Sequence, residues 1–187
     1  MKNKTEESIK LIGTEALAIF EAKNSDYGTS FAHLRPPSMT DQLFIKIKRV
    51  RTIENNNGNQ KVEDARRDDM LGIINYTIMG IMLLEQSEDT LSKIKKEALI
   101  VLYKKIRTDI ETIRLNKNHD YGEAWRDMRI PSITDQIYSK IHRIKAIEEN
   151  GGKVSVSEGI KPLYNDIVNY AFFWIILWDQ KHKKQMN

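Results

Sequence analysis

The sequence predicts an all-α protein whose two tandem three-helix repeats pack together as a helical bundle with pseudo-two-fold symmetry. Three observations support this prediction. Apolar residues recur at helical spacing, period-two alternation is confined to a few residues around 154–157, and one half of the chain repeats in the other. The repeats are expected to cover residues 1–87 and 88–187 and to form one globular unit, in effect a covalently linked dimer.

The repeat is visible when the chain is displaced by 94 residues. From Lys23 and Lys117 onward, the two halves then align without a gap as far as Tyr76 and Tyr170. The shared strings are Lys-Asn-x-Asp-Tyr-Gly, Arg-x-Pro-Ser-x-Thr-Asp-Gln, Lys-Ile-x-Arg, Ile-Glu and Asn-Tyr. A repeat that served only to build a core would share apolar positions, whereas most of these positions are polar. The repeated polar residues are therefore the candidates for a functional site.

The first helix of each repeat is expected over residues 5–23 and 89–117, where apolar side chains recur with a period near 3.6. A loop that contains Gly and Pro follows in both repeats, at residues 24–39 and 118–133. These loops hold the Asp-Tyr-Gly and Arg-x-Pro-Ser strings, so the repeated motifs begin where the first helix ends.

The second helix is expected to begin at Thr40 and Thr134, because a threonine followed by an aspartate is typical of an N-cap and an acidic first turn. It should end near Asn56 and Asn150, in turns rich in Asn and Gly. The third and most apolar helix is expected over residues 63–86 and 158–181.

Composition excludes several classes of protein. The 187 residues include no cysteine, which excludes disulfides, thiolate zinc sites and cysteine nucleophiles. The net charge of +4 suits phosphate-bearing ligands but is far from that of a polybasic protein. The N-terminal segment does not resemble a signal peptide, and the two longest apolar stretches, residues 70–84 and 167–178, are shorter than a membrane-spanning helix. We therefore expect a cytoplasmic protein with no membrane partner.

The second helix of the second repeat combines a carboxylate with cations. Asp135, Lys140 and Arg143 stand at i, i+5 and i+8, so that Asp135 and Arg143 share a face and Lys140 lies beside them. Phosphoryl chemistry needs such a combination, with the carboxylate on a metal and the cations on phosphate. A solvated helix face with ordinary ion pairs explains the same pattern, and the sequence leaves both interpretations open.

The third helix adds Glu158, Asp166 and Asn169, which lie on roughly one face of an otherwise apolar run. Polar groups inside a buried helix need partners, and either a divalent cation or a structural network of side chains can supply them. In the first repeat the positions of Asp166 and Asn169 hold Gly72 and Asn75, so one carboxylate is missing. A metal site would therefore have its stronger set of ligands in the second repeat.

The Asp-Tyr-Gly loops also allow two interpretations. Gly28 and Gly122 can supply a left-handed turn that the preceding aspartate caps. Alternatively, the aromatic side chains hold a nucleobase and the arginines reach a phosphate. The residues of this candidate substrate site are Tyr27, Phe31 and Arg35 in the first repeat and Asp120, Tyr121, Trp125 and Arg129 in the second.

The second helix of the first repeat carries a run of cations. Lys46 and Arg49 are the counterparts of Lys140 and Arg143, and they belong to the string Lys-x-Lys-Arg-x-Arg over residues 46–51. This run suits a nucleic-acid backbone as well as it suits a triphosphate. Nucleic acid is therefore a further candidate partner.

Three strings of the second repeat resemble the nucleotide modification associated domain type one family in its tandem two-repeat form. They are Lys-Asn-His-Asp-Tyr-Gly-Glu-Ala-Trp-Arg-Asp-Met-Arg (117–129), Ser-Ile-Thr-Asp-Gln-Ile (132–137) and Glu-Gly-Ile-Lys-Pro-Leu-Tyr-Asn-Asp-Ile-Val-Asn-Tyr (158–170). The helical pattern is also similar, more distantly, to the all-α nucleoside triphosphate pyrophosphohydrolases, which bind Mg²⁺ through Glu-x-x-Glu and Glu-x-x-Asp. The candidate acids depart from both spacings, since eight residues separate Glu158 from Asp166.

The resemblance implies a nucleotide-processing protein, and the leading hypothesis is a Mg²⁺-dependent hydrolase of the pyrophosphohydrolase type. Asp135, Glu158 and Asp166 would hold the metal and carry the catalysis. The cations and aromatic residues named above, together with Asp120, Asn75 and Asn169, would bind a nucleoside triphosphate. A non-catalytic module that binds nucleotide or nucleic acid is the first alternative. A helical scaffold whose repeated polar residues are internal contacts is the second. A second copy of the chain is a further candidate partner.

Overall fold

The computed structural model describes residues 2–61, 66–155 and 159–183, with all side chains in these ranges except those of residues 2, 3, 118–121 and 183. Every regular element in this part of the chain is helical, which confirms the all-α prediction. The elements are α1 (Lys2–Tyr27), η1 (Ser30–His33), α2 (Pro36–Asn55), α3 (Arg66–Glu85), α4 (Glu88–Ser92), α5 (Lys96–Tyr121), η2 (Ala124–Asp127), α6 (Ile130–Glu149) and α7 (Ile160–Lys183).

The order of elements confirms the repeat. A long helix, a short 3₁₀ helix and two further long helices make up the first repeat as α1, η1, α2 and α3, and they recur as α5, η2, α6 and α7. The short helix α4 connects the two sets. The helix expected over residues 89–117 is therefore wrong at its start, because α4 and α5 are separate helices.

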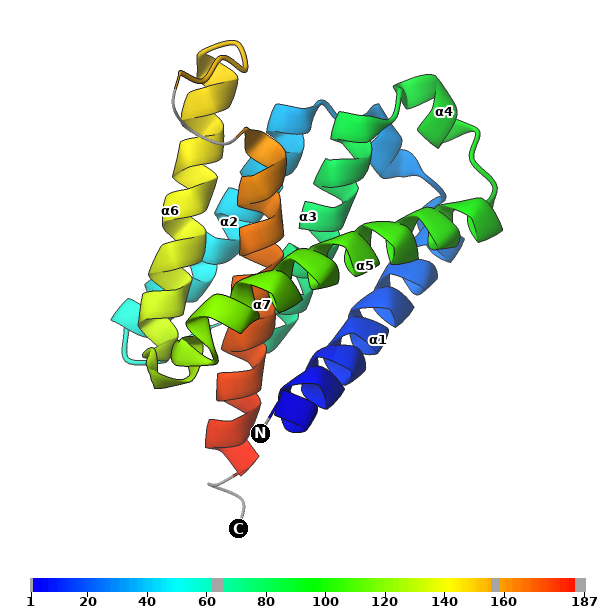
Figure 1. The fold of residues 1–187 in the computed structure, drawn as a ribbon. Coiled ribbons are helices and arrows are strands. Elements are labelled where there is room, and N and C mark those ends of the chain that lie inside the picture. Colours follow the sequence, from blue (N-terminus) through cyan, green and yellow to red (C-terminus); the bar gives the residue numbers. More distant parts are fainter. Residues whose placement is uncertain (1, 62–65, 156–158, 184–187) are drawn as a thin grey trace.

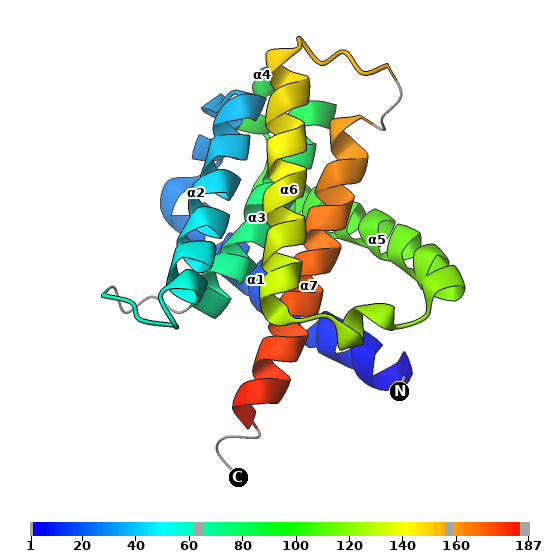
Figure 2. The ribbon, with the colours of Figure 1, turned by 90° about the vertical axis from the view of Figure 1, so that its left-hand side faces the viewer.

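Four helices form the core of the molecule. α2 packs on α3 and α6, and α7 packs on α3 and α6, so the four enclose most of the buried side chains. α1 and α5 lie obliquely across the α3 and α7 side of this bundle (Figure 1). A quarter turn brings α2 and α6 to the front, side by side and away from α1 and α5 (Figure 2). This arrangement gives the pseudo-two-fold relation that the sequence predicts.

α2 and α6 bury equivalent stripes of apolar residues. The buried positions follow helical spacing, and those of α6 lie 94 residues after those of α2; they are Met39, Leu43, Ile47, Val50 and Ile53, and Ile133, Ile137, Ile141, Ile144 and Ile147.

Both helices start four residues earlier than expected. Arg35 and Arg129 are the N-cap residues, and proline in the first turn favours this start because its missing N–H is not needed there. Thr40 and Thr134 therefore lie inside the helices, not at their caps.

The turns after α2 and α6 agree with the sequence prediction. The backbone adopts positive φ at Asn57 (55°) and Gly58 (83°), and at the equivalent Gly151 (64°) and Gly152 (78°). Left-handed residues of this kind end helices, and glycine adopts them without a steric cost.

The repeats meet through reciprocal hydrogen bonds. The Thr40 hydroxyl donates to Glu148 at 2.8 Å, and the equivalent hydroxyl of Thr134 donates to Glu54 at 2.9 Å. Both threonine side chains are buried, so the bonds lie between the helices and not on the surface. Residues near the start of α2 thus meet residues near the end of α6, which makes the two helices antiparallel.

Ion pairs repeat the same relation at the edge of this interface. Arg51 pairs with Asp135 at 3.1 Å, and the equivalent Lys145 pairs with Asp41 at 2.7 Å. Each cation also lies over an aromatic ring of the opposite repeat, Arg51 over Tyr138 and Lys145 over Phe44. Several of the repeated polar residues are therefore contacts between repeats.

α3 and α7 are apolar because they are covered on several sides, and α7 runs through the middle of the bundle. Within the described residues, no helix combines the length and the hydropathy that a bilayer crossing requires.

Candidate functional site

The repeated polar residues of the first repeat gather around a pocket between the end of α1, η1, α2 and α3. Its volume is about 720 Å³. We call it the first-repeat pocket. The residues that matter for its chemistry are Phe20, Lys23, Tyr27, Phe31, Lys46, Asp68, Asp69, Gly72, Asn75 and Tyr76. Aromatic and aliphatic side chains form part of the wall, and charged side chains lie at the α2–α3 side.

Asp69 organises the charged side of the pocket. Its carboxylate is buried in the first turn of α3, accepts a hydrogen bond from Lys46 Nζ at 3.3 Å and forms an ion pair with Arg49. The Lys46 ammonium also lies 5.7 Å from the centre of the Tyr76 ring. Two cations from adjacent turns of α2 thus converge on one buried carboxylate.

Gly72 provides the room that this arrangement needs. A Cβ atom at Gly72 would lie 2.7 Å from Cε of Lys46, so the lysine chain occupies the space that a side chain would fill. The carboxylate missing from this position is replaced one turn earlier by Asp69, which the sequence comparison does not predict because the second repeat has Leu163 there. Lys46 and Lys140 thus occupy equivalent positions, but their carboxylate partners, Asp69 and Asp166, lie one helical turn apart when the repeats are aligned.

The Asp-Tyr-Gly strings form the left-handed turns that the sequence allows. Gly28 has φ of 60° and Gly122 has φ of 61°, as a left-handed turn requires. Asn24, and not Asp26, closes the first turn, because its side-chain amide donates to the Gly28 carbonyl at 2.8 Å. The turn leaves Tyr27 69% exposed at the mouth of the pocket.

Asn75 lines the pocket but is already hydrogen-bonded inside the protein. Its amide donates to the Ala16 carbonyl at 2.9 Å, and its oxygen accepts from the Tyr103 hydroxyl at 2.6 Å. The residue therefore ties α3 to α1 and α5. This buried contact gives Asn75 a structural role, where the sequence suggests substrate binding.

Asp166, the counterpart of Gly72, is held between two lysines in the second repeat. Lys117 and Lys140 each donate to it at 2.7 Å. Burial alone would raise the pKa of Asp166, but the hydrogen bonds and charges of the two lysines outweigh burial and hold the pKa below its usual value. Asp166 is thus an ionised, neutralised carboxylate.

Larger aromatic residues fill the second-repeat counterpart of the pocket wall. Trp125 and Phe173 stand where the first repeat has Phe31 and Met79, which both line the first-repeat pocket. In the second repeat the two rings stack, with centroids 4.3 Å apart and planes inclined by 3°. Trp125 is buried in this stack, so it presents no free face for a nucleobase.

The two expected metal ligands that the structure describes do not lie together. Asp135 lies at the repeat interface with Arg51, Asp166 lies between its two lysines, and Glu158 is outside the described residues. In the described ranges, no group of three or more His, Asp or Glu side chains is placed to hold a metal. The donor set that this part of the chain presents does not fit Mg²⁺.

The remaining predicted residues are dispersed. Arg35, Arg129 and Arg143 have exposed side chains on α2 and α6 and are not among the residues that line the first-repeat pocket. Asp120 and Tyr121 have side chains outside the described part of the structure.

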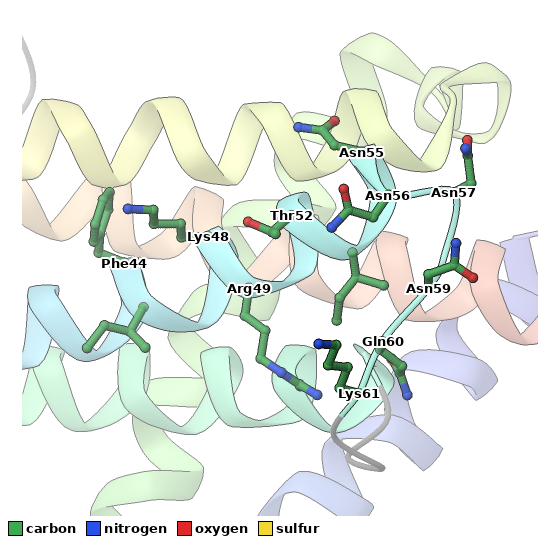
Figure 3. A pocket seen from close by; sticks show the side chains of 12 residues that line it. Phe44, Lys48, Arg49, Thr52, Asn55, Asn56, Asn57, Asn59, Gln60 and Lys61 are labelled. Carbon is green, nitrogen blue, oxygen red and sulfur yellow. The ribbon is translucent and has the colours of Figure 1, made fainter.

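A second hollow, of about 940 Å³, lies on the outer side of α2 and the turn that follows it (Figure 3). Its lining includes the cations Lys48, Arg49 and Lys61 and the apolar residues Phe44, Ile45 and Ile53. The other lining residues carry uncharged amide or hydroxyl groups, and they are Thr52, Asn55, Asn56, Asn57, Asn59 and Gln60. Arg49 extends toward α3, where it meets Asp69 of the first-repeat pocket.

Comparison with known proteins identifies one family. The sequence profile of the nucleotide modification associated domain 1 family matches residues 23–84 and 117–177, one segment in each repeat. The first segment contains most of the first-repeat pocket. No curated protein and no solved structure matches the chain.

Proposed function

Because the chain belongs to the nucleotide modification associated domain 1 family, we propose that it binds a nucleotide in the first-repeat pocket. The observation that supports this most is the pairing of an aromatic wall with converging cations in one cavity of about 720 Å³. Ligand pockets generally combine a largely apolar lining with a few placed polar groups. A nucleotide needs both parts, one for its base and one for its phosphates.

The phosphate end would lie at Lys46. Its side chain is three-quarters buried, lines the pocket, and is held in place by Asp69. Lys23 adds a further cation at the rim. A phosphate that approaches this cluster gains charge-assisted hydrogen bonds from cations that are already held in place.

The base end would lie against Tyr27, whose ring is exposed at the mouth of the pocket. Phe20 and Phe31 are buried behind it, with ring centroids 6.4 Å apart, and shape the wall of the pocket. Stacking of a base on an exposed aromatic side chain contributes about 1–3 kcal/mol and tolerates any base.

Hydrolysis of the pyrophosphohydrolase type remains a prediction from the family resemblance. That chemistry uses Mg²⁺, for which the described carboxylates do not form a fitting donor set, since Asp69, Asp135 and Asp166 each pair with cations. The geometry supports nucleotide binding ahead of turnover, so we assign binding as the function and leave turnover to measurement.

Thermal melting with a panel of nucleotides, in Mg²⁺ and in EDTA, tests the proposal. A ligand that binds the native state raises the melting temperature by mass action. Lys46→Ala should weaken binding tenfold or more, because a charge-assisted hydrogen bond is worth about 1.5–3 kcal/mol. The matched control is Lys140→Ala, the same change in the second repeat, which should leave binding unchanged. No shift with any nucleotide, or equal losses in the two variants, would overturn the assignment. Product analysis of the same mixtures reports turnover.

Nucleic acid is the second candidate ligand, and the hollow in Figure 3 is the observation that favours it. Lys48, Lys61 and a row of amides suit a sugar-phosphate backbone with adjacent base edges, whereas Arg49 is held by Asp69. Binding of single-stranded oligonucleotides should then weaken steeply with salt, and Lys48→Ala should reduce the slope of log affinity against log salt concentration by about one. Affinity that is insensitive to salt would remove this candidate.

A further inference from the structure

A third cavity lies between α1, α5 and α7 and has a volume of about 480 Å³. One side chain in its lining is nearly buried and has no hydrogen-bond partner in the described part of the protein. Asn169 is 7% exposed, and its side-chain amide makes no hydrogen bond to any described residue. Polar side chains that are buried to this extent are nearly always hydrogen-bonded, so an unbonded amide at the wall of a cavity points to a ligand.

The first repeat shows why Asn169 is open. Its counterpart Asn75 is satisfied by the Tyr103 hydroxyl and a backbone carbonyl. The residue equivalent to Tyr103 is Ile9, which has no hydroxyl and lines this cavity together with Asn169. The amide has thus been kept while its internal partner has been replaced by an apolar wall and open space.

The charges around the cavity favour a neutral ligand. Among the described lining, three cations face three carboxylates, and they are Lys10, Arg107 and Arg114, and Glu6, Glu7 and Glu111. Arg114 is buried and forms a bidentate pair with Glu6, at 2.9 and 2.6 Å. A free phosphate would meet as much repulsion as attraction here, in contrast to the first-repeat pocket.

We propose that this cavity binds a nucleobase or nucleoside through the amide of Asn169. An asparagine amide offers one donor edge and one acceptor edge, which pair with adjacent acceptor and donor atoms of a base. Ile9, Ile110 and Phe172 supply apolar surface for the faces of the ring. The site shares no lining residue with the first-repeat pocket, so substitutions can alter the lining of one site without touching that of the other.

Calorimetric titration of the full chain with adenosine, guanosine, cytidine and uridine, and with the free bases, tests the proposal. At least one of these uncharged ligands should bind, and the comparison of nucleosides with free bases shows whether the ribose contributes. Asn169→Leu should weaken that binding at least tenfold. Ile9→Tyr should also abolish it, because a tyrosine there recreates the Tyr103–Asn75 contact and fills the cavity, and it should raise the melting temperature.

Lys46→Ala and Tyr27→Ala serve as controls that alter only the first-repeat pocket. Nucleoside binding that survives both controls and is lost in Asn169→Leu supports the second site. Binding that is lost in the controls but survives in Asn169→Leu would place the nucleoside in the first-repeat pocket and overturn the proposal. The absence of binding by any nucleoside or base at millimolar concentration would also overturn it. If Ile9→Tyr does not fold, Asn169→Leu decides the result alone.

Discussion

Thr40 of the first repeat donates a hydrogen bond to Glu148 of the second, and the same two residues recur 94 positions apart as Thr134 and Glu54 with the roles of the repeats exchanged. The pair defines the pseudo-two-fold relation. Tyr164 joins the first contact, with its hydroxyl 3.1 Å from Thr40, and Trp174 joins the second by donating to Thr134 at 3.0 Å. The interface between repeats is therefore polar at two buried, equivalent points.

These two points should make stability depend on pH. Burial raises the pKa of Glu148 and of Glu54 above 4.5, although the threonine hydrogen bonds act in the opposite direction. Because the pKa of each glutamate is higher in the folded than in the unfolded protein, protonation of the glutamate favours folding. This contribution to the unfolding free energy is complete below pH 4.5 and is lost as pH rises through the folded-state pKa. The Glu54→Gln, Glu148→Gln double variant should thus exceed the wild type in unfolding free energy at pH 7, and the difference should close toward pH 4.5. Urea denaturation at a series of pH values measures this, and a difference that does not change with pH would contradict it.

Two equivalent asparagines should respond oppositely to one substitution. Asn75→Leu leaves the buried Tyr103 hydroxyl and the Ala16 carbonyl without a partner, which should cost about 1–3 kcal/mol or more. Asn169→Leu removes an amide that has no partner among the described residues, so its unfolding free energy should stay the same or rise. Each variant is the other's control in chemical denaturation. Equal losses in both would show that Asn169 is bonded in solution.

Two glycines of α3 should also behave differently. Gly72→Ala should change the unfolding free energy by no more than about 1 kcal/mol, because the higher helix propensity of alanine offsets the displacement of the Lys46 side chain from Asp69. Gly80→Ala should destabilise the protein by about 1–3 kcal/mol, because the added methyl group lies 3.1 Å from the ring of Tyr164, which is fully buried and held by Thr40. Thermal or urea denaturation of the two variants compares them directly, and a loss in Gly80→Ala that is no larger than the loss in Gly72→Ala would contradict the packing at Gly80.

Asp135 distinguishes a metal ligand from a contact between repeats. Its carboxylate is more than half exposed and pairs with a partly exposed Arg51, so Asp135→Asn should lower the unfolding free energy by no more than about 1 kcal/mol. Nucleotide affinity should not change. The control is Asp41→Asn, which removes the equivalent pair with Lys145. If Asp135→Asn alone abolished a Mg²⁺-dependent activity, the prediction that Asp135 is a metal ligand would be supported.

The sequence predicts the architecture well because helices and repeats leave local marks. Periodicity places α2, α3, α6 and α7 within a few residues, and the match at a displacement of 94 residues identifies every pair of equivalent helices. The starts of α2 and α6 are missed because proline in the first turn outweighs the Thr-Asp signal four residues later. The α4–α5 break is missed because helical spacing continues across it.

The candidate site is predicted only in part, and the reason is physical. Recurrence shows that two residues are equivalent but not what their side chains face. Thr40, Asp41 and Glu54 recur because each contacts the other repeat, whereas Lys46 recurs while its acidic partner moves from one helical turn to another. Asp69 is not marked by the repeat, since its counterpart is a leucine. A threonine and a glutamate that recur together 14 residues apart are the signal that could have revealed the interface.

The sequence by itself determined the helices, the duplication, and the family that the repeated strings indicate, because each of these depends on neighbours along the chain. Only the tertiary structure decided what surrounds each copy of a repeated residue. Phe31 and Met79 leave room in one repeat where Trp125 and Phe173 stack in the other, and Ile9 leaves Asn169 unbonded where Tyr103 satisfies Asn75. These differences arise where helices distant in sequence pack together, so side-chain volume and hydrogen-bond reach across the bundle decide them.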